Sequence, residues 1–282
     1  EMFTVAAASV PFRIPIGHIH GGETSEGAMD EVFRHSITKM AHLHFTSTRE
    51  YRNRVIQLGE NPENVIVSGA PALDHLRRLS TMSRDQLTER FGISFDPAPL
   101  VVTFHPTTLA LEKTTEDTQA LLDAVGATGL PVVFTAPNSD PYGRQIRRMI
   151  EEFVSDHPGS RFVESLGVEG YFTWLESAAA MVGNSSSGII EAASFELPVV
   201  NVGDRQKGRV AGDNVIHVEA CASEIEIAVR RALAPGFRES LKGICNPYGD
   251  GHASEKIVTA LKHREVNRAS MQKSFFNLDF AV

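Results

Sequence analysis

Two histidines and four carboxylates lie between positions 18 and 31, in the segment His-Ile-His-Gly-Gly-Glu-Thr-Ser-Glu-Gly-Ala-Met-Asp-Glu. The residues before this segment predict a strand over 14–20, so most of the segment forms the loop that follows the strand. A carboxylate crowded by others has its pKa raised enough to act as an acid, while a neighbour stays ionised as a base. The cluster therefore indicates proton transfer in a cleft from which water is excluded.

Two other interpretations of this cluster stay open. His18 and His20, which the two-residue period of a strand places on one face, could ligate zinc together with the acidic residues, although no third ligand stands at a fixed spacing. Asp30 and Glu31 could instead only stabilise the first turn of the helix that begins there, where negative charge is favourable. Arg34 lies one turn further along and can orient these carboxylates.

A second candidate site lies where an apolar strand pattern ends at Val182 and is followed by Ser185, Ser186, Ser187 and Gly188. A helix begins there, and its first turn has unpaired N–H donors and the positive end of the helix dipole, so a phosphate or diphosphate is the natural ligand. The segment is not a Walker loop, because no Lys stands beside the glycines. A serine that merely caps an ordinary helix is the alternative interpretation.

A basic loop follows the short strand predicted over 197–202. Arg205 and Lys207 lie between Gly203 and Gly208, and Arg209 follows directly. Loops after the strands of an open parallel sheet converge on one crevice, so this loop can face the same anion as the serines. A solvated run of charge is the alternative, but two glycines directly after a buried strand favour a loop that binds a ligand.

Polar residues also follow two other predicted strands. His105 comes after the strand predicted over 100–104, and Asn138 lies in the loop 136–140 after the strand predicted over 132–134. Each position alone is a weak signal. Their recurrence at successive strand ends indicates a ligand crevice, because independent surface loops need not all carry hydrogen-bonding residues there.

Strands and helices alternate along most of the chain, which predicts an α/β fold with a doubly wound parallel sheet. Besides those already given, we predict strands over 43–46, 65–67, 161–163, 181–182 and 215–218. We predict helices over 30–41, 51–58, 115–125, 142–154, 171–178, 188–195, 223–233 and 253–264, and a short helix opened by a capping box at Ser83–Gln86. A Pro-bearing linker over 70–99 suggests domains over 1–85 and 86–262, followed by a tail over 263–282.

Composition excludes several classes of function. A net charge of −8 over 282 residues argues against nucleic acid or an acidic membrane as the main partner, and no apolar run reaches the length of a membrane span. The cysteines, Cys221 and Cys245, have no metal-type spacing and fit free thiols in a reducing cytoplasm. The chain starts with an alanine-rich amphipathic segment and has no initiator Met at position 1, so we expect an amino-terminal segment to be absent from it.

The combined motifs resemble the hydrolysing UDP-N-acetylglucosamine 2-epimerases of sialic acid synthesis, over nearly the whole chain. The motifs that carry the resemblance are His18–Glu23, Arg34–Lys39, Phe104–Pro106, Asn184–Gly188 and Gly203–Arg209. The resemblance implies two Rossmann-like domains in the glycosyltransferase-B arrangement, the first of them incomplete here, with the nucleotide mostly on the second domain and catalysis in the cleft.

The resemblance also implies residue roles. Asp30 and Glu31 match the acidic pair implicated in catalysis, and proton transfer falls to His20 or Glu23 because some relatives carry a Glu where His20 stands. The residues that match UDP contacts are His105, Asn138, Leu166, Ser185, Ser186, Glu191 and Arg205, with Glu191 suited to the ribose hydroxyls. Arg205, Arg209 and the Ser185–Gly188 helix terminus would stabilise the leaving diphosphate.

The expected reaction converts UDP-N-acetylglucosamine to N-acetylmannosamine and UDP through a 2-acetamidoglucal, without metal or redox cofactor. One alternative is the same chemistry on a UDP- or GDP-linked diacetamido-trideoxy sugar, as in legionaminic acid synthesis. Another is a glycosyltransferase-like protein that binds a nucleotide sugar without epimerising it. We expect a cytoplasmic homo-oligomer. Because the family's glycine-rich first strand–loop–helix and its first Gly-Asp-Arg motif are missing, we expect this span alone to be inactive.

Overall fold

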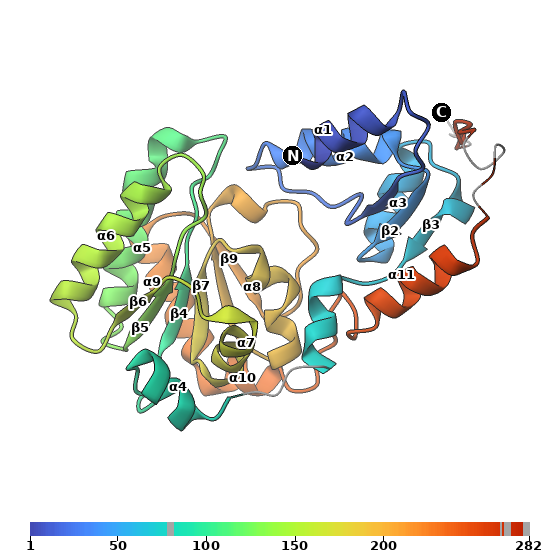
Figure 1. Cartoon of the computed structure of the whole chain (residues 1–282). Coiled ribbons are helices and arrows are strands. Elements are labelled where there is room, and N and C mark those ends of the chain that lie inside the picture. Colours follow the sequence, from blue (N-terminus) through green and yellow to red (C-terminus); the bar gives the residue numbers. More distant parts are fainter. Residues whose placement is uncertain (78–81, 266, 268–271, 279–282) are drawn as a thin grey trace. The chain divides into compact units, whose positions relative to one another are not determined.

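The computed structural model describes residues 1–77, 82–265, 267 and 272–278. The chain forms two compact units, whose elements are labelled in Figure 1. Unit 1 contains Glu1–Ser25, Met29–Arg77 and Pro247–Val282, and unit 2 contains Glu26–Ala28 and Arg78–Asn246. Part of the expected linker, 78–81, and part of the expected tail, 266, 268–271 and 279–282, lie outside the described residues.

Unit 1 is built on a parallel sheet of three strands in the order β1 (Gly17–Ile19), β2 (Leu43–Thr46) and β3 (Val65–Val67). The central strand, β2, is buried at all four positions because both of its edges are paired and both of its faces are covered. The helices of this unit are α1 (Met2–Ser9), α2 (Asp30–Met40), α3 (Arg49–Gln57) and α11 (Ala253–Lys262), with 3₁₀ turns at Pro62–Asn64 and Pro71–Arg77.

Local sequence explains where α3 begins and which face it buries. The Thr48 hydroxyl accepts a hydrogen bond from the backbone N–H of Tyr51 at 3.2 Å, which satisfies one of the free donors of the first turn. Tyr51 and Val55, four residues apart, are fully buried, and Ile56 is nearly so. This spacing puts their side chains on one face of α3, which packs against β3 and β2.

The last helix, α11, returns to unit 1 and not to unit 2. Its Ile257 packs against Leu43 and Phe45 of β2. Both carboxylate oxygens of Asp74 accept hydrogen bonds from the first turn of α11, at 2.8 Å from the N–H of Ala253 and 2.6 Å from that of Ser254. The structure therefore differs from the expected division at residues 86 and 262, because a buried carboxylate before residue 78 caps a helix after residue 246.

The described part of the C-terminal tail packs on the same unit. The Lys273 ammonium lies 2.8 Å from Glu60 and 2.9 Å from the Lys39 carbonyl at the end of α2, where positive charge complements the helix dipole. The Phe275 ring covers Gly59, which has a φ of +88° and where an added Cβ would lie 2.4 Å from the ring. Burial alone would raise the pKa of Glu60, but hydrogen bonds from His44, Lys273 and Lys39 outweigh it and lower the pKa to about 2.

Unit 2 is built on a parallel sheet of six strands. Their bounds are β4 (Leu100–Thr103), β5 (Val132–Thr135), β6 (Arg161–Val163), β7 (Ala180–Gly183), β8 (Val199–Val202) and β9 (Val215–Val218). The helices are α4 (Arg84–Phe91), α5 (Thr114–Gly126), α6 (Gly143–Asp156), α7 (Gly167–Ser177), α8 (Ser186–Ile190), α9 (Ala222–Leu233) and α10 (Pro235–Ser240). Three 3₁₀ turns cover Leu111–Lys113, Ala192–Phe195 and Asp204–Gln206.

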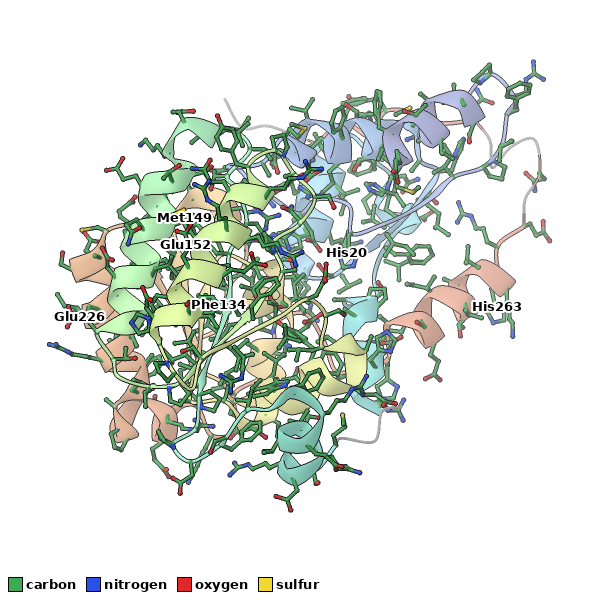
Figure 2. The ribbon with its side chains drawn as sticks, turned by 60° about the vertical axis from the view of Figure 1, so that its left-hand side comes forward. His20, Phe134, Met149, Glu152, Glu226 and His263 are labelled. Atoms are coloured by element: carbon green, nitrogen blue, oxygen red, sulfur yellow. The ribbon has the colours of Figure 1, made fainter. Side chains whose placement is uncertain are left out.

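The strand order is β6-β5-β4-β7-β8-β9, so the winding direction reverses between β4 and β7. Helices α5, α6 and α9 cover one face of the sheet, and α7 and α8 lie on the other (Figure 1). Phe134 of β5, labelled in Figure 2, packs edge-on against Phe153 of α6 with ring centroids 5.4 Å apart. A ligand crevice is expected at the carboxyl ends of β4 and β7, where the reversal occurs.

Most expected elements are present, but three differ. The strand expected over 14–20 is limited to Gly17–Ile19, because His20 adopts a φ of 64° and leaves the extended conformation. The helix expected over 188–195 is two pieces, because the hydrogen bonding shifts from the i−4 to the i−3 carbonyl after Glu191. Helix α10 was not expected. The capping box at Ser83 is confirmed, with both reciprocal hydrogen bonds to Gln86 present.

Candidate active site

The loops after β4, β7 and β8 meet at the reversal point of the unit 2 sheet. The backbone N–H of His105, after β4, donates to the side-chain oxygen of Asn184, after β7, at 2.7 Å. The Arg205 guanidinium, after β8, donates to the Asn184 carbonyl at 3.2 Å. Residues separated by up to a hundred positions in the sequence are thus brought together, and two of them, His105 and Arg205, were predicted from their place at strand ends.

His105 is held as a neutral imidazole. Burial, helped by the neighbouring Arg205 charge, lowers the pKa of His105 to about 4. Its Nδ1 lies 3.0 Å from the backbone nitrogen of Asn138 and accepts the hydrogen of that group. The ring proton is therefore on Nε2, which leaves one N–H donor on the opposite side of the ring.

The loop that follows β7 and carries Ser185–Ser187, here called the serine loop, leaves the strand through a conformation that only glycine adopts without strain. Gly183 has a φ of +135°, and an added Cβ would lie 2.0 Å from the Thr103 carbonyl oxygen. Ser185 then caps α8, and its hydroxyl accepts from the N–H of Ser187. Because α8 has only five residues, its dipole is small, so an anion here must rely on the local N–H groups, the hydroxyls and Arg205.

Tyr171 of α7 and Glu191 at the end of α8 lie beside this loop. The Tyr171 hydroxyl contacts the Ser187 hydroxyl, and no sequence motif indicated this partner. Glu191 caps the end of α8, and burial raises the pKa of its carboxyl to about 7. Burial and the Glu191 charge also raise the pKa of Tyr171. Glu191 is therefore partly protonated at neutral pH, and its ionisation is coupled to whatever polar group lies beside it.

The remaining unit 2 candidates take different places. Asn138 contacts Asp140 through its side-chain amide, and the Leu166 side chain is buried at the N-terminal end of α7. Gly188 is buried where an added Cβ would lie 3.0 Å from Val199. Arg209 and Lys207 help to line a cavity of about 420 Å³ at the ends of β8 and β9.

Unit 1 contains a cavity of about 460 Å³ next to the end of β1, which His18, His20, Asp30 and Arg34 help to line. Burial, together with the positive charges of His44 and Arg34, lowers the pKa of His18 to about 4, so its ring is neutral. The His20 side chain, labelled in Figure 2, is about one third exposed. The cavity thus combines a buried neutral imidazole, an accessible imidazole and a carboxylate, a set able to accept and donate protons.

Glu23 anchors His20. Its Oε1 lies 2.6 Å from His20 Nδ1 and accepts from the Ser47 hydroxyl at 2.7 Å, while the Glu23 side chain is almost fully buried. A carboxylate on one ring nitrogen fixes the orientation of an imidazole. The loop can follow this path because Gly22 has a φ of +78°, and an added Cβ there would lie 2.3 Å from the Tyr51 carbonyl.

Asp30 and Glu31 differ in their contacts. Glu31 accepts hydrogen bonds from the Ser25 N–H at 2.6 Å and from Arg34 at 3.1 Å, and lies 2.9 Å from His35. Asp30 has no hydrogen-bond or ion-pair partner among the described residues and faces the cavity. The contacts thus make Glu31 an anchor of the loop and leave the Asp30 carboxylate open to a ligand.

Two findings bear on other classes of function. Within the described ranges, no group of three or more His, Cys, Asp or Glu side chains is arranged to hold a metal ion. No helix in the described part of the chain has the length and apolar character needed to cross a membrane.

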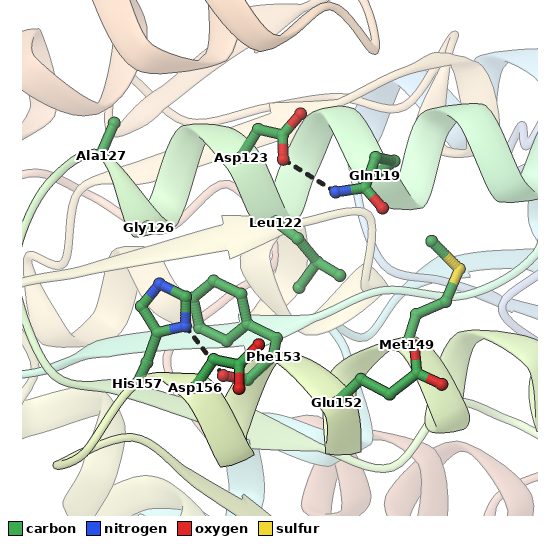
Figure 3. A pocket seen from close by; sticks show the side chains of 10 residues that line it. All are labelled: Gln119, Leu122, Asp123, Gly126, Ala127, Met149, Glu152, Phe153, Asp156 and His157. Atoms are coloured by element: carbon green, nitrogen blue, oxygen red, sulfur yellow. Dashed lines mark hydrogen bonds between the residues drawn. The ribbon is translucent and has the colours of Figure 1, made fainter.

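A further cavity of about 520 Å³ lies between the C-terminal halves of α5 and α6. Figure 3 shows His157 stacked on Phe153 and the hydrogen bond between Gln119 and Asp123 at its edge. This end of the helices adjoins the amino ends of the parallel strands, so the cavity is separate from the strand-end loops.

The protein is of the α/β class, with parallel sheets and polar loops, suited to ligand binding, at the carboxyl ends of the strands. The chain belongs to the UDP-N-acetylglucosamine 2-epimerase family, since the family of that description matches residues 1–262. The resemblance drawn from the sequence motifs is therefore confirmed, as is the α/β class.

Two relatives are hydrolysing epimerases. UDP-N,N'-diacetylbacillosamine 2-epimerase (hydrolyzing) of Legionella pneumophila is 40% identical over 263 residues, 93% of this chain and 68% of the relative. GDP/UDP-N,N'-diacetylbacillosamine 2-epimerase (hydrolyzing) of Campylobacter jejuni is 33% identical over 99% of this chain and 72% of the relative. The solved structure of UDP-GlcNAc 2-epimerase from Neisseria meningitidis bound to UDP-GlcNAc aligns with a TM-score of 0.80. The alignment has 20% identity and covers 93% of this chain and 73% of the Neisseria chain, so the likeness shows a shared fold.

Proposed function

We propose that the protein is a hydrolysing 2-epimerase whose substrate is a UDP-linked 2-acetamido sugar, with UDP-N,N'-diacetylbacillosamine as the first candidate. The observation that carries nucleotide binding is the meeting of His105, the serine loop and Arg205 at the reversal point of the unit 2 sheet, and the family match supports the reaction class. The 40% identity to the Legionella pneumophila epimerase supports the choice of sugar. UDP-N-acetylglucosamine is the second candidate, favoured by the family match.

In this proposal unit 2 binds the nucleotide. His105, Asn138, Leu166, Ser185, Ser186 and Arg205 contact UDP, and the Glu191 carboxylate accepts hydrogen bonds from the ribose hydroxyls. The bond between C1 of the sugar and the diphosphate oxygen breaks, and the electron pair leaves with the diphosphate. Arg205, Arg209 and the N–H groups of the serine loop stabilise the charge that develops there.

Unit 1 supplies the proton-transfer groups. A base removes the proton from C2, which forms a C1–C2 double bond as the diphosphate leaves. Water then adds its oxygen to C1, and a proton returns to the opposite face of C2. Asp30 fits one of these two proton transfers because its carboxylate has no other partner among the described residues, and His20 fits the other because Glu23 orients its ring.

The test is to incubate the full-length protein separately with the two UDP-sugars in deuterated water and to follow products by NMR. Release of UDP together with a free sugar that is inverted and deuterated at C2 is expected, at a higher kcat/KM for the diacetylated sugar. Arg205→Ala should weaken UDP binding at least tenfold, while the control Arg147→Ala, at an exposed arginine of α6, should not. UDP binding without any product would support the glycosyltransferase-like alternative instead.

A further inference from the structure

The backbone pairing of β4 and β7 ends one residue before the loops that carry the candidate nucleotide ligands. Thr103 and Gly183 are the last pair of residues in register. Beyond them the two chains separate, and the peptide groups of His105 lose the partner strand that would have satisfied them. Buried peptide groups without partners are strongly unfavourable, so something must replace that strand.

The Asn184 side chain provides the replacement. Its oxygen accepts from the His105 N–H at 2.7 Å, and its amide nitrogen donates to the His105 carbonyl at 2.8 Å. A primary amide has one acceptor and donors on a single planar group, so it matches both polar groups of one residue as a neighbouring peptide would. Aspartate lacks the donor, and alanine and serine are too short to make both bonds.

The Asn184 backbone carbonyl holds the third loop. It accepts from the Gln206 side chain at 2.8 Å and from Arg205 at 3.2 Å, which occupies both lone pairs of the oxygen. Asn184 is 1% exposed and Gln206 is 3% exposed, so water does not compete for these bonds. One residue therefore joins the loop after β7 to the loops after β4 and β8.

We infer that Asn184 is a positioning residue for nucleotide binding, which fixes His105 through its side chain and, with Gln206, fixes Arg205 through its backbone carbonyl. This inference rests on the proposed function, because His105 and Arg205 matter only if the loops bind a nucleotide. Asn184 does not itself contact the nucleotide in this account. Its effect is to keep two ligand groups, 100 residues apart in the sequence, in one fixed arrangement.

The first test compares two buried asparagines of the same unit by calorimetric titration with UDP. Asn214 is fully buried and its side chain bridges to the Leu197 carbonyl at 2.9 Å, but it lies at the amino ends of β8 and β9, away from the loops. Asn184→Ala should weaken UDP binding at least tenfold and Asn214→Ala less than twofold, although both should lower Tm. Wild-type UDP affinity in Asn184→Ala would overturn the inference.

A double-mutant cycle separates positioning from a general loss of stability. If Asn184 acts through His105, then His105→Ala should weaken UDP binding much less in the Asn184→Ala background than in the wild type. In the Asn214→Ala background the effect of His105→Ala should be unchanged. Equal effects of His105→Ala in all three backgrounds would contradict the inference.

Gln206→Met keeps the inference testable if Asn184→Ala does not fold, because methionine has a similar length and no donor. It should weaken UDP binding and reduce the further effect of Arg205→Ala. Unchanged UDP affinity in Gln206→Met would overturn the role assigned to the Asn184 carbonyl. Failure of the wild-type protein to bind UDP would instead refute the proposed function and the inference together, so the two failures are distinguishable.

Discussion

We predict that Glu191 makes the affinity for UDP depend on pH, because burial raises the pKa of its carboxyl to about 7 in the free protein. If the carboxylate accepts hydrogen bonds from the ribose hydroxyls, UDP must bind to the ionised form. The affinity for UDP should therefore rise as pH increases through 7, and Glu191→Gln should remove this contribution.

The size of the effect follows from the fraction of Glu191 that is ionised. With a pKa of about 7, this fraction is about one tenth at pH 6 and about nine tenths at pH 8, so the apparent Kd for UDP should fall about tenfold between them. The buried charge also affects the free protein. Burial raises the folded-state pKa of Glu191 above its unfolded value. Its contribution to the free energy of unfolding is therefore fully present below pH 4.5, where the carboxyl is protonated in both states, and is lost as pH rises through 7.

Calorimetric titration with UDP from pH 6 to 8 tests the prediction in the wild type and in Glu191→Gln. The diphosphate itself titrates near pH 6, but it does so equally with both proteins, so the difference between their pH slopes reports Glu191 alone. His105 does not contribute, because its pKa of about 4 lies below the range. Identical slopes for the two proteins, or tighter UDP binding at pH 6 than at pH 8, would refute the reasoning.

Asp30→Asn should lower kcat at least a hundredfold without changing Tm, which steady-state kinetics checks. Glu31→Gln should instead lower the free energy of unfolding by about 1–3 kcal/mol, because it weakens the hydrogen bonds of Glu31 to Ser25 and Arg34, and urea denaturation checks it. Gly183→Ala should cost at least about 3 kcal/mol or abolish UDP binding, since a Cβ there would overlap the backbone of β4, and calorimetry with UDP checks it. Lys273→Met should lower the free energy of unfolding by about 1–3 kcal/mol at pH 7. The loss should be smaller at low pH, because the lowered pKa of Glu60 gives a stabilisation that is present above pH 4.5 and lost as pH falls towards 2. Urea denaturation at several pH values measures this dependence.

Each of these predictions has an outcome that contradicts it. Near-normal turnover by Asp30→Asn would return that residue to the role of a helix-terminus charge. A Gly183→Ala protein with wild-type Tm and UDP affinity would show that β4 and the serine loop can move apart. A constant effect of Lys273→Met across the acid range would mean that Lys273 stabilises the end of α2 and not Glu60.

The sequence predicted the fold well where local signals and tertiary structure agree. The capping box at Ser83 needs only residues three apart, and the strands of unit 2 are short apolar runs between helices, so both could be read locally. The α11 helix was also predicted, but its membership of unit 1 depends on Asp74, which lies almost 180 residues earlier. No local pattern encodes such a pairing.

The candidate site was predictable from the sequence only where a residue follows an apolar strand. His105, Ser185 and Arg205 could be found because each follows an apolar strand, and parallel topology brings strand ends together. Tyr171 and Gln206 were missed, since a tyrosine in a helix and a glutamine in a basic loop have no distinctive spacing. Polar residues beside a predicted ligand loop were the available signal, but only the structure shows which of them bond to it.

The contacts of Asp74 and Lys273 join early and late parts of the chain, so they affect the order in which the two units fold during synthesis. All the strands of unit 2 are synthesised before residue 247, whereas α11 and residues 272–278 of unit 1 are synthesised after them. Domains tend to fold as units as soon as they are available. We therefore expect the loops of unit 2 to form first, and, if they bind UDP as proposed, a nascent chain should bind UDP before it completes the unit that carries Asp30 and His20.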